Sequence, residues 1–164
     1  MIAIIEYNAG NITSVARALH SIGQDFVITD DTKMLNAASH AIFPGVGAAG
    51  EAMAYLKDKK LDVWLKQCFR SGKPILGICL GTQIILDASE ENDAACIGLV
   101  GGTTRRFPES LTAAGRALKI PHMGWNSVAF RRPHPVFAGV PEEAEYYFVH
   151  SYYPSPESEE AVLG

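Results

Sequence analysis

The chain has little of what marks several large classes of protein. It contains only three cysteines, Cys68, Cys79 and Cys96, and their spacing forms neither a disulfide framework nor a C-x-x-C pair. It has no apolar run of about 18 residues, the length needed to span a bilayer. The opening MIAIIEYN is too short, and becomes acidic too early, for a signal peptide. We therefore expect a cytoplasmic protein with reduced thiols, no metal site and no membrane contact.

A basic surface is missing too. The 164 residues carry a formal net charge of −4, with 48% hydrophobic and 20% charged residues, a balance typical of a globular protein that does not bind nucleic acid. Two arginine pairs, at 105–106 and 131–132, are the only basic spots. Solvated loop charges are the simpler interpretation of them, and contact with a phosphate or a partner is the alternative.

Short β-like runs alternate with helical patterns along the first half. The predicted strands are 2–6, 25–29, 40–47 and 75–79, and the predicted helices are 11–22, a short one after 30–32, 49–58 and 61–70. The run ILGIC at 75–79 has the composition of a strand buried on both faces. This alternation predicts an α/β protein with a mostly parallel, doubly wound sheet and helices on both faces.

Shorter β-like runs after about residue 90, including 146–153, predict antiparallel additions in the second half. No repeat or linker divides the chain, so we expect one domain over 1–164. Ligands in doubly wound sheets bind beyond the carboxyl ends of the strands. By that rule the loops 7–11, 44–48 and 77–82 lie along one edge and form one site.

The run GICLG at 77–81 has the glycine-x-nucleophile-x-glycine form of a nucleophile elbow. Its glycines permit a strained strand-to-helix turn that would present the Cys79 thiol at the edge of the sheet. The turn aims the backbone N–H of Leu80 at the place where an attacked carbonyl oxygen becomes negative, and the helix dipole favours a thiolate. The PGVG run at 44–47 offers a second donor, because its glycines allow close approach and a peptide flip.

A lone cysteine in an apolar stretch is usually a small buried side chain, and we keep that interpretation for Cys68 and Cys96. For Cys79 the preceding strand and the glycine loop favour a nucleophile. Gln83 follows four residues later, about one helical turn along the same face. There its carboxamide would either hold the polar end of a small substrate or face solvent.

A cysteine nucleophile normally needs a histidine, because a thiol with a pKa of about 8.5 is largely protonated at neutral pH. The chain has five histidines. Packing, solvent or a loop position explains His20, His40 and His134. His122 in PHMGWN and His150 in FVHSYY are better placed, yet neither has an acidic neighbour in a motif that would orient it. The residues therefore show no convincing base.

With these motifs the chain resembles the glutamine amidotransferase subunits of imidazole glycerol phosphate synthase, which are class I (triad) amidotransferases. Class I enzymes in general share the elbow GICLGTQ at 77–83. The narrower likeness rests on segments in that family's order: AGNITSV at 9–15, FPGVGAAGEAM at 43–53, GICLGTQIILDASEE at 77–91, KIPHMGWNSV at 119–128 and YYFVHSYY at 146–153. The likeness covers essentially all of the chain and implies a flavodoxin-like fold.

The resemblance assigns roles by position and implies no cofactor. Cys79 would form a γ-glutamyl thioester and release ammonia from glutamine. The other implied site residues are Val46, Gly47 and Leu80 for the oxyanion hole, and Gln83, His150, Ser151 and Tyr152 for binding the amino-acid end of glutamine.

The resemblance also implies a partner. Asn11 and Trp125 match positions that in the family face the cyclase subunit, a (β/α)8 barrel. That subunit uses the ammonia to make imidazole glycerol phosphate and an aminoimidazole carboxamide ribotide in histidine biosynthesis.

The chain departs from the family pattern in three places. EYNAGN at 6–11 and Thr82 differ from the commoner choices and leave the chemistry intact. The family continues past EEAVLG with an FHPEKS-type segment that carries the catalytic histidine and glutamate, so we expect a C-terminally truncated chain of very weak activity. The alternatives are another class I subunit, such as that of anthranilate synthase, which PHMGWN argues against, and a non-catalytic docking module with a relic cysteine.

Overall fold

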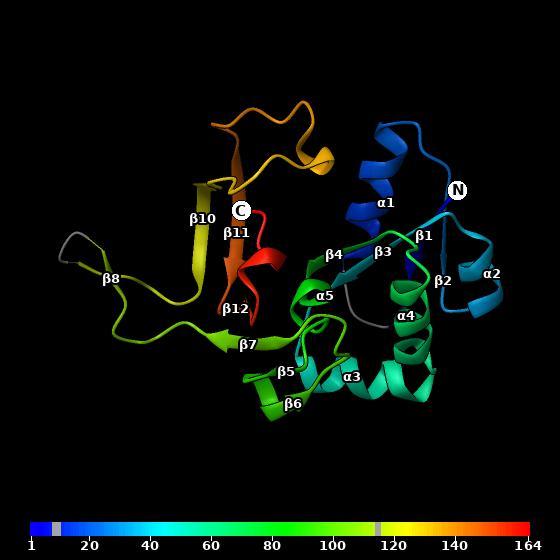
Figure 1. Ribbon diagram of the computed structural model, residues 1–164, viewed down its shortest axis with the longest axis horizontal. Coiled ribbons are helices and arrows are strands. Elements are labelled where there is room, and N and C mark those ends of the chain that lie inside the picture. Colours follow the sequence, from blue (N-terminus) through cyan, green and yellow to red (C-terminus); the bar gives the residue numbers. More distant parts are fainter. Residues whose placement is uncertain (8–10, 114–115) are drawn as a thin grey trace.

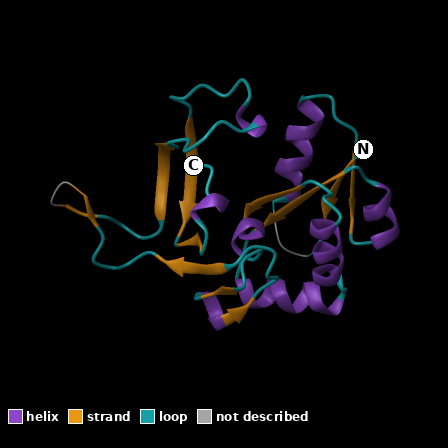
Figure 2. Ribbon diagram, viewed as in Figure 1, coloured by secondary structure: helices purple, strands orange, loops and turns teal. Residues whose placement is uncertain are grey.

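Four parallel strands form the core of the N-terminal half (Figures 1 and 2). The computed structural model describes residues 1–7, 11–113 and 116–164. The first elements are β1 (Ile2–Ile5), α1 (Ile12–Ser21), β2 (Phe26–Thr29), α2 (Thr32–Ala37), β3 (His40–Gly45), α3 (Ala49–Asp58), α4 (Leu61–Arg70), β4 (Ile75–Cys79) and the short helix α5 (Leu80–Gln83). The sheet order is β2-β1-β3-β4, with every neighbouring pair parallel.

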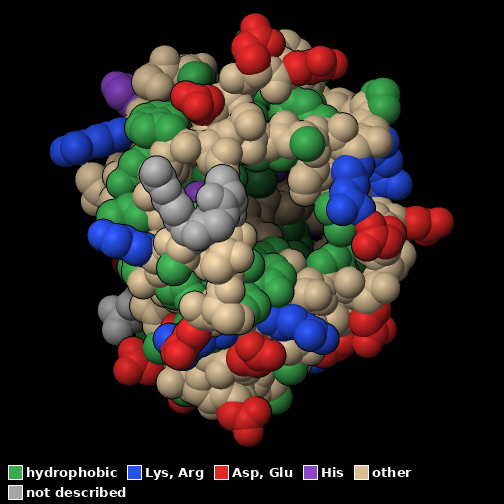
Figure 3. Space-filling model, turned by 90° about the vertical axis from the view of Figure 1, so that its left-hand side faces the viewer, with side chains coloured by type: hydrophobic (Ala, Val, Ile, Leu, Met, Phe, Trp, Pro, Cys, Tyr) green, Lys and Arg blue, Asp and Glu red, His purple; other side chains and the backbone are tan. Residues whose placement is uncertain are grey.

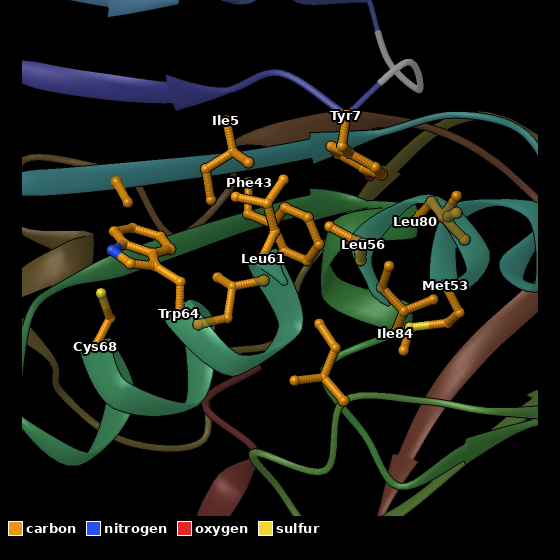
Figure 4. Close-up of a cluster of buried hydrophobic side chains, with 14 of the residues drawn as sticks. Ile5, Tyr7, Phe43, Met53, Leu56, Leu61, Trp64, Cys68, Leu80 and Ile84 are labelled. Atoms are coloured by element: carbon orange, nitrogen blue, oxygen red, sulfur yellow. The ribbon is translucent and has the colours of Figure 1, made fainter. Parts of the chain in front are cut away.

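Helices cover both faces of this sheet. On one face Leu19 of α1 packs against Ile4 and Ile42. On the other face α3 and α4 bury a larger cluster, in which Leu61 and Trp64 approach the strands (Figure 4). Each fully buried leucine in that cluster contributes about 1.5 to 3 kcal/mol of transfer free energy. The predicted α/β class with a doubly wound parallel sheet is confirmed.

Strand β4 lies at the edge of the sheet, so the prediction that it is buried on both faces is wrong. Leu76 and Ile78 are 52% and 39% exposed. Because Leu76 pairs with Ile42 in parallel register, both strands direct these side chains to the face that α1 covers. The cluster under α1 draws residues from β1, β2 and β3 but includes none from β4. No described helix therefore covers these two side chains.

Short, mostly antiparallel strands make up the second half, as predicted. The elements are β5 (Ala88–Ser89), the 3-10 turn η1 (Glu91–Asp93), β6 (Ala94–Ala95), β7 (Gly102–Arg106), β8 (Thr112–Ala113), β9 (Arg116–Ala117), β10 (His122–Ser127), η2 (Pro135–Phe137), β11 (Glu145–His150), β12 (Tyr152–Pro156) and η3 (Glu159–Ala161). Strands β10 and β11 pair with each other, β12 and β6 join the sheet that contains β5 and β7, and β8 and β9 form an arm that extends from the body (Figure 1).

Three features of the described residues bear on membrane contact, on metal binding and on the arginine pairs. None of the described helices is long and apolar enough to cross a membrane, and the described residues contain no group of three side chains that would hold a metal ion. The arginine pairs contact nearby acidic segments: Arg106 pairs with Glu109, Arg131 pairs with Glu159, and Arg132 donates to the carbonyl of Glu160. These contacts agree with solvated loop charges.

Candidate active site

The turn from β4 into α5 places Cys79 at a sharp elbow. Its backbone has φ 55° and ψ −117°, a conformation that costs a non-glycine residue about 1 to 3 kcal/mol. A side chain on the following Gly81 would overlap the carbonyl oxygen of Phe43, so glycine is required where the elbow crosses β3. The Cys79 thiol is exposed. This geometry is that of a presented nucleophile.

The PGVG loop lies directly beside the elbow. Gly45, the last residue of β3, pairs with Cys79, the last residue of β4. Val46 is 51% exposed, and Gly47 has φ +98°, which lies in the region that favours glycine. Leu80, on the other side, is buried. The loop and the elbow therefore lie side by side, and an oxyanion hole built from their backbone N–H groups needs this arrangement.

A pocket of about 410 Å³ opens at this spot. Its size falls in the range of about 300–1,000 Å³ that is usual for small-molecule sites. Every residue predicted for catalysis, the oxyanion hole or substrate binding lines this pocket: Val46, Gly47, Cys79, Leu80, Gln83, His150, Ser151 and Tyr152. Three residues that were not predicted also line it: Glu91, Pro121 and Val149. The fold thus gathers segments that are more than a hundred residues apart in the sequence, such as those of Val46 and Tyr152.

A larger cavity, of about 680 Å³, lies beside the base of the arm. Its lining is mostly apolar and includes Phe107, Leu118 and Met123, but not Cys79. Figure 3 views the molecule from the side of the arm and shows hydrophobic side chains around a hollow. Size alone would favour this cavity, but it lacks a nucleophile and an oxyanion hole, so the smaller pocket is the candidate active site.

One backbone carbonyl organises the polar side of the pocket. The carbonyl oxygen of Tyr152 accepts hydrogen bonds from Gln83 Nε2, at 3.1 Å, and from His150 Nδ1, at 2.8 Å. The hydroxyl of Thr104, which is fully buried, donates to the carbonyl of Gln83 at 2.7 Å. Gln83 is therefore held from two directions, and the interpretation of it as a free surface side chain is excluded.

These bonds define the tautomers of two histidines. A carbonyl only accepts, so Nδ1 of His150 carries the proton and Nε2 of the neutral ring accepts. The nitrogen 3.2 Å from Nε2 is Nδ1 of His122, which is the donor of this pair when the His150 ring is uncharged. Phe107 contacts the His150 ring edge-on, with centroids 5.1 Å apart, and Phe148 stacks on His122 at 5.1 Å. Both nitrogens of His150 are thus engaged, and no described histidine hydrogen-bonds the Cys79 thiol.

The family model for class I glutamine amidotransferases matches residues 3–163. The chain belongs to this family. It is 51% identical over 157 residues to imidazole glycerol phosphate synthase subunit HisH of Nitratidesulfovibrio vulgaris, strain Miyazaki F, covering 95% of this chain and 74% of that protein. It is 47% identical over 165 residues to the HisH subunit of Maridesulfovibrio salexigens, covering 100% of this chain and 77% of that one.

Solved structures agree on the fold. A glutamine amidotransferase crystal structure aligns with a TM-score of 0.67 at 14% identity, covering 100% of this chain and 76% of that one. A second, from Thermotoga maritima, aligns with a TM-score of 0.60 at 17% identity, covering 94% of this chain and 61% of that one. At these identities the likeness concerns the architecture, which is the one that the sequence predicted for this amidotransferase.

Two residues near Cys79 had no predicted role. Glu91 brings a carboxylate to the pocket that Cys79 also lines. It lies in the segment 77–91, but nothing in the local sequence indicated this position. Tyr7 is 1% exposed, and its hydroxyl lies where a side chain on Gly45 would be. Burial, and the negative charge of a Cys79 thiolate, raise the pKa of Tyr7 far above its ordinary value. Its hydroxyl therefore stays protonated.

Asn11 and Trp125 lie outside the pocket. Asn11 accepts a hydrogen bond from the Ser14 amide and caps α1. Trp125 is 67% exposed on β10 and contacts Tyr147 edge-on, with centroids 5.6 Å apart. The predicted loop 7–11 falls only partly within the described residues, since 8–10 lie outside them.

Proposed function

We propose that this amidotransferase is the glutaminase subunit of an imidazole glycerol phosphate synthase and serves histidine biosynthesis. The observation that carries the proposal is the pocket, which brings an exposed cysteine on an elbow together with two backbone donor segments and a polar wall. The identity to HisH subunits selects this member of the family. Three free cysteines suit the reducing cytoplasm in which such a pathway operates.

The proposed chemistry is acyl transfer. The Cys79 thiolate attacks the side-chain amide carbon of glutamine, a carbon–sulfur bond forms, and the carbonyl oxygen becomes negative. Backbone N–H groups of the loop at Val46 and Gly47, and of Leu80, stabilise that charge. Collapse of the intermediate, with a proton delivered to nitrogen, expels ammonia and leaves a γ-glutamyl thioester, which water hydrolyses to glutamate and the free thiol.

The opposite wall binds the amino-acid end of the substrate in this proposal. Gln83 and the segment 150–152 present amide, hydroxyl and backbone groups to its polar atoms. Glu91 supplies a negative charge that complements the ammonium group of glutamine. Binding at this end fixes the orientation of glutamine in the pocket, so that its side-chain amide points toward Cys79.

The partner in this proposal is a cyclase that consumes the ammonia. Asn11 and Trp125 belong to the docking face. Trp125, Tyr147, Met123 and Val149 lie on one side of the pair β10–β11, and each is more than half exposed. An exposed apolar face of this kind is typical of a protein interface.

A second candidate is a non-catalytic docking module. The engaged state of His150 favours it, because no described histidine is placed to deprotonate Cys79. The elbow favours the enzyme, because a strained backbone at an exposed cysteine has no structural benefit.

The deciding experiment compares Cys79→Ala with the wild type in the assembled synthase, with Cys96→Ala as the matched control away from the pocket. We expect Cys79→Ala to abolish synthesis that depends on glutamine and to spare synthesis supplied with ammonia, whereas Cys96→Ala changes neither. Equal loss of both syntheses in Cys79→Ala would assign this residue to docking. Retained glutamine-dependent synthesis would remove Cys79 as the nucleophile.

A further inference from the structure

Helix α3 lacks a capping side chain of its own. Its N-cap residue is Ala48, which has no side-chain acceptor for the first amides of the helix. The two preceding helices differ: Asn11 caps α1 and Asp31 caps α2 through their own side chains. The start of α3 matters to the site, because only Ala48 separates its first residue from Gly47 of the oxyanion loop.

A segment 42 residues later supplies the missing acceptors. Glu91 Oε2 accepts from the Ala49 amide at 2.9 Å, and Asn92 Oδ1 accepts from the Gly50 amide at 3.3 Å. Asn92 adopts a left-handed backbone with φ 60°, a conformation that asparagine tolerates well. A side chain on Gly50 would come within 3.2 Å of Asn92 Cβ, so the two residues pack closely.

The segment that carries these acceptors is itself held in place. Ser89 and Ala94, on its two sides, are buried and pair with each other between β5 and β6. The Ser89 hydroxyl accepts from the Glu91 amide at 3.1 Å. Because both ends of this segment are held in the sheet, the segment can fix the position of the start of α3, which it contacts.

We infer that 89–92 is a tether that positions the oxyanion loop, with Glu91 and Asn92 as positioning residues that cap α3 from another sheet. Glu91 has two oxygens: Oε2 holds the helix, while Oε1 has no hydrogen-bond partner among the described residues, and Glu91 lines the pocket. The Glu91 carboxylate therefore both holds the start of α3 and lines the pocket in which the ligand would bind. The inference deepens the proposed function and rests on it for its kinetic test.

The first test needs no catalytic activity. Amide hydrogen exchange is measured on the 164-residue protein and on Asn92→Gly, which keeps the left-handed backbone but loses the acceptor. We expect exchange at 49–52 to accelerate about three- to tenfold, the equivalent of one net hydrogen bond. Asn92→Asp keeps the acceptor and should exchange like the wild type. The control Asp31→Ala removes a comparable cap and should affect only the start of α2. Unchanged exchange at 49–52 in Asn92→Gly would overturn the tether.

The second test is glutaminase kinetics of the amidotransferase as the cell makes it, bound to its cyclase. Asn92→Gly should lower kcat about three- to tenfold and leave KM unchanged, because an oxyanion hole acts on the transition state. Asn92→Asp should restore kcat, and Asp31→Ala should leave it intact. If Asn92→Gly exchanges faster at 49–52 but keeps an unaltered kcat, then Asn92 caps α3 without positioning the oxyanion loop, and the inference is overturned. If the protein as the cell makes it shows no glutaminase activity with the cyclase bound, the proposed function is refuted, and the exchange test still decides the tether.

Discussion

The hydroxyl of Tyr7 is predicted to destabilise the fold, and Tyr7→Phe tests this directly. Tyr7 is 1% exposed, and its hydroxyl is a buried side-chain oxygen without a hydrogen-bond partner in the described residues. Its ring packs against Phe43, with centroids 5.0 Å apart, inside the main core cluster (Figure 4). Phenylalanine keeps this ring and removes only the oxygen.

The magnitude follows from two opposing terms. A buried hydroxyl left without a partner costs about 1 to 3 kcal/mol, and its removal recovers that amount. The void left by one oxygen, about 12 Å³ at ~24 cal/mol per Å³, costs roughly 0.3 kcal/mol. We therefore expect the free energy of unfolding to rise by about 0.7 to 2.7 kcal/mol. For a domain of this length that corresponds to a rise in Tm of roughly 2 to 10 °C.

Urea denaturation of the 164-residue chain measures the change. Trp64 is 3% exposed in the same cluster, so its fluorescence reports on this core. The midpoint should move to higher urea with an unchanged m-value. Tyr55→Phe is the matched control, because Tyr55 is only partly buried on α3, and it should change stability by less than about 0.5 kcal/mol. A loss of stability in Tyr7→Phe would refute the reasoning, since it would mean that the hydroxyl has a partner in the folded protein.

Three further predictions concern the site. His122→Leu removes the N–H that holds His150 Nε2 and should raise KM for glutamine about two- to tenfold. His122→Asn offers an amide donor instead and should retain most of the affinity. Equal effects of the two substitutions on KM would contradict a hydrogen-bonding role for His122. At pH 8 iodoacetamide should label the exposed Cys79 first, because burial raises the pKa of Cys96 to about 11 and also raises the pKa of Cys68. Peptide mass spectrometry measures the labelling rate of each cysteine. Labelling of Cys96 as fast as that of Cys79 would contradict this prediction. The 164-residue polypeptide should hydrolyse glutamine only weakly even with the cyclase present, because no described histidine hydrogen-bonds the thiol; rapid turnover by a sample of confirmed mass would disprove it.

Local elements could be predicted from the sequence because their signals are local. The predicted helices 49–58 and 61–70 coincide with α3 and α4, since apolar spacing and the stops around them act within a few residues. The elbow was equally readable, because two glycines around a cysteine are a short-range steric requirement. Such patterns do not depend on which strand lies beside which.

Contacts between distant segments could not be predicted in this way. The run 146–153 looks like one strand, but it breaks at Ser151, because β11 pairs with β10 while β12 pairs with β7. Leu76 and Ile78 are exposed because α1 covers β1, β2 and β3 but not β4. The local sequence of β4 does not encode which strands a distant helix covers.

The sequence by itself determined the class of fold, the cysteine elbow and most of the pocket lining, because each rests on a short pattern or on a likeness of whole segments. Only the tertiary structure decided that Glu91 caps α3, that Tyr7 lies under Gly45 and that both nitrogens of His150 are engaged. Apart from the bond between His150 and Tyr152, these contacts join residues that are 28 to 42 positions apart. Their strength depends on burial and on hydrogen-bond geometry, which exist only once the chain has folded.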